Sequence, residues 1–387
     1  MSASPAPTRR RPKDRKQQIL TQARELFVER GYRNVSVGMI TERVGITPAG
    51  LYRHFANKTE LLEAVVRESF GDLPIPAVRF TDLDTALALA CDMAMERPYL
   101  STLWSREARH LPPELRTEIR TALRETASAY ERLLLAARPG LSRAQADLLA
   151  WALQSVMTAT AIPGLRVSDP GLPALLRAVA QTVAHTPLRN EVVASRAPRT
   201  GIAPVSTRER LLTSAMRLFA ERGYHETSMA ELGAAAEVTG PNLYSYFDNK
   251  AAVLHAVSDR AAQALWIDLG HTLAAHDTAQ EALPELASGY VRIAAAWSPA
   301  SVRDSGEPDI IALALDQQRE YLAEWIALLR AARPDLDATT ARTLPLIAFA
   351  LVDQLSRTPH LATGATFAGD LRDITLAVLA TPAPSVT

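Results

Sequence analysis

The sequence contains one pattern twice, at a constant separation of 192 positions. The segment LFVERGY at 26–32 is matched by LFAERGY at 218–224, and the match continues without a gap as far as Leu62. A weaker match, AARP at 136–139 and 331–334, is separated by 195 positions. The 387 residues also exceed the roughly 250 to 300 at which a single hydrophobic core stops growing. We therefore expect two copies of one structural unit.

The composition is that of an ordinary folded protein, with 48% hydrophobic and 22% charged residues. A single cysteine, Cys91, excludes an internal disulfide and a CxxC pair. The longest nearly apolar stretch, 344–352, contains Pro345 and is shorter than the ~18 residues of a membrane span. The amino-terminal sequence MSASPAPTRRRPKDRK has no apolar core behind its basic cluster, unlike a secretory signal. We expect a cytoplasmic protein.

Helical patterns fill both copies. Ile19, Ala23 and Phe27 lie on one helical stripe, and Gly31 can adopt the left-handed conformation that ends a helix. Further helix starts are marked by residues that cap amino termini: Ser36, Thr47, Asn57 and Ser228. Ser228 also forms a capping box with Glu231. The Ala/Leu-rich remainder has no run of alternating β-branched residues. The sequence therefore predicts an all-α fold.

The predicted domains follow the repeat. The segment 184–206 has three prolines and little periodicity, which indicates a linker between the units. Each unit then consists of a helix-turn-helix domain followed by a helical bundle. The expected parts are a basic disordered arm at 1–13, the first helix-turn-helix domain at 14–70, its bundle at 71–183, the linker, the second helix-turn-helix domain at 207–261 and its bundle at 262–382.

Two short helices joined by the turn 44–46 have helix-turn-helix spacing. The second of them places Leu51 and Phe55, four residues apart, toward the interior. Its small first residues allow close entry into a major groove. The outward positions are Thr47, Pro48, Ala49, Gly50, Tyr52, Arg53 and His54. Donors for a DNA backbone are expected from the amides after Ser36, the Thr47 hydroxyl and the Lys58 ammonium.

These residues carry a family resemblance. The pattern GYRNVSVGMITERVGITPAGLYRHFANKTELL and its repeat GYHETSMAELGAAAEVTGPNLYSYFDNKAAVL resemble the DNA-binding domain of TetR/AcrR-family transcriptional regulators, with LY-x-[HY]-F-x-N-K as the specific part. Two such units in one chain resemble the single-chain tandem TetR regulators of actinobacteria. Regulators of that type are associated with operons for lipid or steroid uptake and breakdown.

The resemblance implies a set of DNA-binding residues. Phosphate contacts are implied for Thr47, Tyr52 and Lys58 and, in the second copy, for Thr239, Tyr244 and Lys250. Positions at or near base edges are Ala49, Gly50, Arg53 and His54 in the first copy, and Pro241, Asn242, Ser245 and Tyr246 in the second. Ser36, Pro48 and Ser228 complete the two interfaces, and the arm residues Arg9, Arg10 and Arg11 add phosphate or minor-groove contacts.

The two copies differ in charge and in the turn. Residues 9–66 carry a net charge of +6, whereas residues 201–258 carry −1. Glu237 stands where the first copy has Gly45, which costs roughly 1 kcal/mol if that position needs a positive φ. We expect a ligand-responsive repressor that reads a non-palindromic operator as a covalent pseudo-dimer. The alternative is a ligand-binding or scaffolding protein whose second helix-turn-helix no longer contacts DNA.

In the TetR/AcrR family, the bundles hold the effector pocket. Aromatic candidates for its lining are Trp104, Tyr130, Trp151, Tyr290, Trp297 and Trp325, and such residues are mostly core. The resemblance implies a small apolar effector, lipid-like or steroid-like. No cofactor is expected, and the sequence has no GxSxG, HExxH, P-loop or GxGxxG motif of an enzyme.

At several positions the sequence also allows a purely structural role, without contact to DNA or metal. Tyr52 and Tyr244 could simply pack, Arg53 and His54 could be solvated helix surface, and the basic arm could be a solubilising tail. Glu107 and His110, three apart, form a metal pair only if further ligands join them, and an ordinary histidine is the stronger interpretation.

Overall fold

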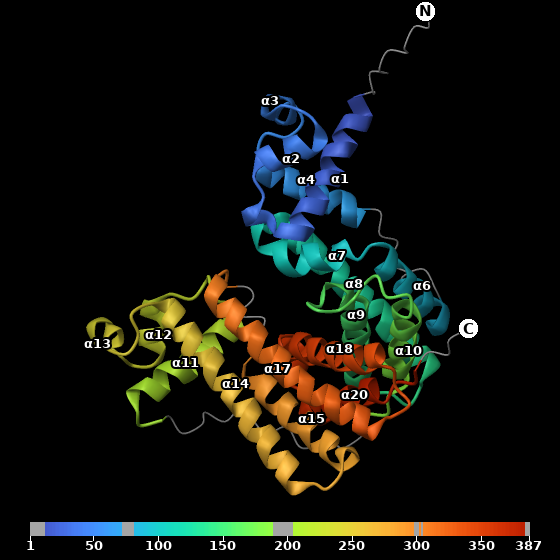
Figure 1. Cartoon of the computed structure of the whole chain (residues 1–387), viewed down its shortest axis with the longest axis vertical. Helices are drawn as coiled ribbons and strands as arrows, with labels where there is room; N and C mark the ends of the chain where they lie inside the picture. The colour runs from blue at the N-terminus through green and yellow to red at the C-terminus, as the bar shows by residue number, and fades with distance from the viewer. Residues whose placement is uncertain (1–11, 72–80, 189–203, 298–301, 303–304, 384–387) are drawn as a thin grey trace, which may run out of the picture. The chain divides into compact units, whose positions relative to one another are not determined.

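The computed structural model describes residues 12–71, 81–188, 204–297, 302 and 305–383. These residues form helices, turns and irregular connections, and none of them lies in a strand, which confirms the all-α prediction (Figure 1). The chain divides into two compact units, Met1–Ala129 and Tyr130–Thr387. Of the helices in the described part of the chain, none is both long and apolar enough to cross a membrane.

The first unit begins with the first helix-turn-helix domain. Its elements are α1 (Pro12–Arg30), a 3-10 turn at Tyr32–Asn34, α2 (Val37–Val44), α3 (Pro48–Tyr52) and α4 (Lys58–Gly71), followed by α6 (Leu83–Glu96), α7 (Tyr99–Thr102), helical turns at Leu103–Glu107 and Ala108–His110, and the first part of α8 (Pro113–Ala137). Helix α1 packs on α2 and α4. The expected stripe of α1 is buried completely at Ile19, Ala23 and Phe27, which accounts for the amphipathic spacing.

The second unit contains the end of the first copy and the whole described part of the second. Its elements are α9 (Arg143–Met157), a 3-10 turn at Ala159–Ala161, α10 (Leu172–His185), α11 (Thr207–Arg222), α12 (Met229–Ala235), α13 (Gly240–Tyr244), α14 (Lys250–Ala275), α15 (Ala279–Ala296), α17 (Pro308–Ala332), α18 (Ala338–Ser356), α19 (Pro359–Ala362) and α20 (Phe367–Leu379). Most of the expected linker, 189–203, and most of the basic arm, 1–11, lie outside the described residues.

Helices of the two copies pack together inside the second unit. Helix α9 packs against α18, and α10 packs against α20. Between these copies the Thr158 hydroxyl donates to Gln354 Oε1 at 3.3 Å, and His360 Nε2 lies 3.1 Å from Asp147 Oδ2. The two compact units divide inside α8, between Ala129 and Tyr130. This point lies within the segment that the sequence assigned to the first bundle, 71–183. The domain limits drawn from the sequence stay a prediction.

Candidate nucleic-acid interface

The first helix-turn-helix is set by local hydrogen bonds. Ser36 Oγ accepts from the Met39 amide at 3.2 Å and so caps α2. Gly45 ends α2 with a φ of 71°, a left-handed conformation that favours glycine. Thr47 Oγ1 then accepts from the Gly50 amide at 3.2 Å, which caps α3 with Pro48 at its start. The caps expected from the sequence are therefore formed, because each joins residues only three apart.

The outer side of α3 is open to solvent. Leu51 and Phe55 are buried as expected, and they anchor the helix to α1 and α4 through the domain core. The Tyr52 side chain, by contrast, is 50% exposed. The residues expected to face DNA are exposed at Thr47, Pro48, Ala49 and Arg53 and partly buried at Gly50 and His54. One face of this short helix is thus free for a partner.

Lys58, at the start of α4, is held by the fold. Its ammonium donates to the backbone carbonyls of Tyr32 and Val35, both at 2.8 Å, and lies 4.2 Å from the centre of the Tyr32 ring. Burial lowers the pKa of Lys58, and the charge of Glu107 acts in the opposite direction. An ammonium has three donors, so one remains for a phosphate. The phosphate contact of Lys58 stays a prediction.

The second copy repeats this arrangement at Lys250. Its ammonium donates to the carbonyls of Tyr224 at 2.7 Å and Thr227 at 2.8 Å, and lies 4.3 Å from the Tyr224 ring centre. Sequence reasoning missed both tyrosines as partners of these lysines. The signal was present, because in each copy the tyrosine of the repeated Gly-Tyr pair stands 26 residues before the lysine.

The surface of the second copy that corresponds to the outer side of α3 comprises residues 239–246 and is called the second reading surface. It differs from the first, residues 47–54, in its details. Ser228 and Glu231 form the expected capping box at the start of α12. Glu237 has a φ of 56°, so the turn keeps the left-handed conformation of its glycine counterpart. Thr239 precedes α13 without a side-chain cap bond. The exposed residues of this surface are Thr239, Asn242, Tyr244, Ser245 and Tyr246, while the side chain of Pro241 lies outside the described residues.

Basic residues at the start of α1 lie beside the first reading surface. The Arg15 guanidinium donates to the carbonyl of Val44 at 3.4 Å, in the turn between α2 and α3. The Lys16 ammonium lies 5.5 Å from the centre of the Phe55 ring. Arg9, Arg10 and Arg11 are outside the described residues, and the first turns of α1 lie next to the turn between α2 and α3.

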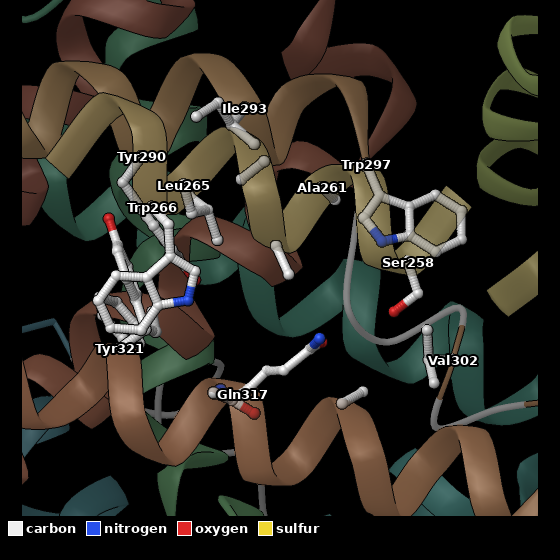
Figure 2. A pocket seen from close by; sticks show the side chains of 15 residues that line it. Ser258, Ala261, Leu265, Trp266, Tyr290, Ile293, Trp297, Val302, Gln317 and Tyr321 are labelled. Carbon is white, nitrogen blue, oxygen red and sulfur yellow. The ribbon is translucent and has the colours of Figure 1, made fainter. Parts of the chain in front are cut away.

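The aromatic candidates for an effector pocket separate into different environments. Tyr290 and Trp297 line a cavity between α14, α15 and α17, where Figure 2 shows both side chains. Trp325 is buried next to Tyr290, with 5.9 Å between the two ring centres. The other three lie elsewhere. Trp104 packs on the core of the first helix-turn-helix domain, called the first head below. Tyr130 is buried in α8, and Trp151 lies edge-on to His360.

The Glu107 and His110 pair belongs to the surroundings of Tyr32. The His110 ring centre lies 4.9 Å from that of Tyr32, and Glu107 is buried close enough to influence the pKa of Lys58. This pair therefore lies close to Tyr32 and Lys58, whose contact holds the start of α4. In the second copy Glu307, the residue before α17, accepts a hydrogen bond from the Tyr224 hydroxyl at 2.8 Å.

Both helix-turn-helix segments match a known family. The profile described as "Bacterial regulatory proteins, tetR family" matches residues 19–65 and again residues 211–257. The two matches cover the described α1 to α4 and α11 to α14 regions that build the two reading surfaces, at the separation found in the repeat.

Individual relatives are similar over one such segment. The HTH-type transcriptional activator FasR of Mycolicibacterium smegmatis is 40% identical over 65 residues, which cover 16% of this chain and 30% of that protein. The HTH-type transcriptional repressor ComR of Escherichia coli is 42% identical over 60 residues, which cover 16% and 29%. The solved structure of Mycobacterium smegmatis AmtR is 26% identical, with a TM-score of 0.35 over 47% of this chain and 89% of that chain. This chain thus spans less than a third of the length of either FasR or ComR.

Proposed function

We propose that this chain, two segments of which match the tetR family of bacterial regulatory proteins, is a member of that family and a cytoplasmic DNA-binding transcriptional regulator. The observation that carries the proposal is the exposed face of α3, held by a capped amino terminus and a buried underside. Small residues at the start of this helix allow its backbone to approach base edges, and the free amides at helix starts suit phosphate groups.

The two heads read DNA as a covalent pseudo-dimer. The packing of α9 on α18 and of α10 on α20 supports this part of the proposal, because the two copies then meet within one chain. The reading surfaces differ, with Arg53 and His54 in the first copy against Ser245 and Tyr246 in the second. Unlike heads favour a non-palindromic operator, since a symmetric site requires identical readers.

We further propose that the protein is a repressor released by a small apolar effector. One relative is named an activator and another a repressor, so the direction of regulation rests on our proposal. The cavity lined by Tyr290 and Trp297 supports a ligand response. Such a ligand changes DNA binding only by as much as its affinity differs between the bound and released conformations.

The test is selection of binding sites from a random duplex pool, followed by gel shifts on the selected sequence. Arg53→Ala is expected to relax the preference at particular bases, with a loss of about 1 to 3 kcal/mol against the best site. Arg319→Ala is the matched control, because Arg319 is an exposed arginine of α17 whose partner is Asp316. No enrichment of any sequence, or equal effects of both substitutions, contradicts DNA reading by α3.

The second candidate is a protein in which only the first head contacts DNA. It is favoured by the net charge of −1 in residues 201–258 and by the strained turn at Glu237. The double substitution Asn242→Ala with Tyr244→Ala distinguishes the two functions. A footprint that shortens supports two readers, whereas an unchanged footprint and affinity support a scaffolding role for the second head.

A further inference from the structure

The helices that join the two copies match residue by residue. Helices α9 and α18, which pack together, begin 195 positions apart, and α10 and α20, which also pack together, begin at the same separation (Figure 1). Arg138 and Arg333 donate to carbonyls at the ends of α10 and α20, again 195 positions apart. Each residue on one side of this interface therefore has a known counterpart on the other side.

The counterparts differ in charge at the edges of the interface. Asp147 in α9 corresponds to Arg342 in α18, so a carboxylate in the first copy is replaced by a guanidinium in the second. Leu165, after α9, corresponds to His360 in α19. The two surfaces that meet are thus related by the repeat but are not alike.

At one end of the interface, Asp147 contacts His360 of the other copy. His360 Nε2 lies 3.1 Å from Asp147 Oδ2, and the Asp147 side chain is 30% exposed. The His360 ring centre also lies 5.6 Å from that of Trp151, which is in α9 with Asp147. Burial raises the pKa of Asp147, His360 lowers it, and the charge of Glu131 raises it. The charged form of this carboxylate is therefore stabilised by a side chain of the second copy.

At the other end, Arg342 of the second copy lies against Gly164 of the first. A Cβ atom at Gly164 would lie 3.3 Å from Arg342 Nη2, closer than ordinary van der Waals contact. Gly164 has a φ of 86°, a conformation that favours glycine. The counterpart of Gly164 in the second copy is Pro359, whose ring holds φ near about −65°. The first copy therefore has a recess for the guanidinium that the second copy does not offer.

We propose that these two contacts select the unlike copy as the partner, so that a first copy pairs with a second copy and like copies from two chains do not pair. Two first copies would place each Asp147 against the uncharged segment at Gly164. Two second copies would place each Arg342 against Pro359 and His360, where a proline ring replaces the recess and the neighbouring side chain is basic. A partly buried charge without an opposite partner, and two basic groups in proximity, both disfavour association.

This inference deepens the pseudo-dimer of the proposed function, because it names the residues that decide which surfaces meet. It requires no DNA. A duplicated chain has two related interfaces and could associate with other chains through either of them. The residues at the two ends restrict this choice, so that the two reading heads held together are unlike heads.

Crosslinking of the full chain without DNA reports which copies pair. Thr158 and Gln354, hydrogen-bonded across the interface, are both replaced by cysteine in a Cys91→Ala background, and a short bismaleimide is added. We expect a crosslink within one chain. With Thr158→Cys alone we expect no covalent dimer, because like copies do not meet. Dimers of that single-cysteine chain would overturn the inference and the pseudo-dimer together, whereas dimers formed only with both cysteines keep the partner choice and reject the one-chain pseudo-dimer.

Charge substitution tests the choice itself. Asp147→Arg gives the first copy a guanidinium that fits over Gly164 of another first copy at both ends, so this surface becomes complementary to itself. We expect covalent dimers of the Thr158→Cys chain to increase at least about tenfold when Asp147→Arg is added. Adding His360→Asp as well restores a pair of opposite charges between the copies and should remove these dimers again. A role in stability alone would change the Tm without creating dimers.

A second variant serves if Asp147→Arg does not fold. Arg342→Asp places a carboxylate against His360 of another second copy, and should increase covalent dimers of the Gln354→Cys chain in the same way. Asp316→Arg, at an exposed position of α17 whose ion pair lies within that helix, is the matched control and should form none. Chains that stay monomeric with both interface substitutions overturn the partner choice and leave the pseudo-dimer intact. Gel shifts with the selected duplex test the DNA-binding proposal separately.

Discussion

Single residues account for much of the difference between the two heads. Glu237 has a φ of 56° at the position where the first head has Gly45 with a φ of 71°. Of the described residues other than glycine, Glu237 alone has a positive φ. A side chain in this conformation brings its Cβ close to the backbone, and glycine avoids that contact. The second head therefore keeps the turn at a cost in stability.

Glu237→Gly is expected to stabilise the second head by roughly 1 kcal/mol, because the strain at Cβ is removed and only partly offset by the greater freedom of the unfolded chain. The change in the free energy of unfolding is measured by urea titration, with hydrogen exchange of the amides in α11 to α14 as the probe. Gly45→Ala is the reciprocal control and should destabilise the first head by a similar amount. A destabilised Glu237→Gly variant contradicts this account of the turn.

The two lysines at the starts of α4 and α14 have a structural role that can be measured. Lys58→Met and Lys250→Met should each destabilise their own head by about 2 kcal/mol, because buried carbonyls lose a charged donor and the aromatic contact is lost. Thermal unfolding without DNA is the measurement. Arg53→Ala, on the exposed face of α3, should leave the Tm unchanged. A normal Tm in both lysine variants would assign these lysines to DNA contact alone.

At the scale of elements, the start of α17 is joined to the second head. The Tyr224 hydroxyl donates to Glu307, while its ring lies beneath the Lys250 ammonium. One tyrosine thus connects the segment between α11 and α12 to the start of α17. In the first head the Tyr32 hydroxyl pairs with Thr59 at 2.9 Å instead. The matching tyrosines therefore have different polar partners: that of Tyr32 lies within its own head, and that of Tyr224 lies at the start of α17.

Tyr224→Phe should cost about 2 kcal/mol at neutral pH, since a hydrogen bond to a charged acceptor is lost. Burial, and then the bond to Glu307, raises the pKa of Tyr224 above its ordinary value of 10.0. The native protein keeps this proton where the unfolded chain releases it, so the stabilisation present below pH 10.0 falls as the pH rises toward the folded pKa. Urea titrations should show the difference between wild type and variant shrinking above that pH. A constant difference argues against the raised pKa.

At the scale of the molecule, the proposed pseudo-dimer would replace an association step by covalent linkage. An ordinary homodimer needs two chains, whereas here α9 and α18 come from the two copies of one polypeptide. The charge is also unequal, with +6 in residues 9–66 and −1 in residues 201–258. The first head is therefore expected to supply most of the salt-dependent affinity for DNA.

The stoichiometry on DNA tests the pseudo-dimer. Native mass spectrometry of the complex with the selected duplex should give one chain per duplex, because both readers are already present in that chain. The control is a duplex with only one half of the selected site, which should bind more weakly. An obligatory ratio of two chains per duplex rejects the pseudo-dimer.

Salt dependence tests the basic arm. Replacing Arg9, Arg10 and Arg11 by Gln should flatten the slope of log affinity against log salt concentration by up to about 2.7, if each arginine neutralises one phosphate. Replacing three basic residues of α11, namely Arg208, Arg217 and Arg222, is the matched comparison in the second head. An unchanged slope in the arm variant shows that the arm is only a solubilising tail.

The sequence by itself determined the duplication, the helical class, the resemblance of two segments to one family, and the caps at Ser36, Thr47 and Ser228. These depend on contacts between residues three or four apart, as between Thr47 and Gly50, or on a motif that occurs twice. Only the tertiary structure decided that Lys58 contacts the carbonyls of Tyr32 and Val35, that α9 packs on α18, and which aromatic side chains surround a cavity. Such contacts join residues far apart along the chain, and apolar spacing cannot distinguish a residue in a packed core from one beside a void.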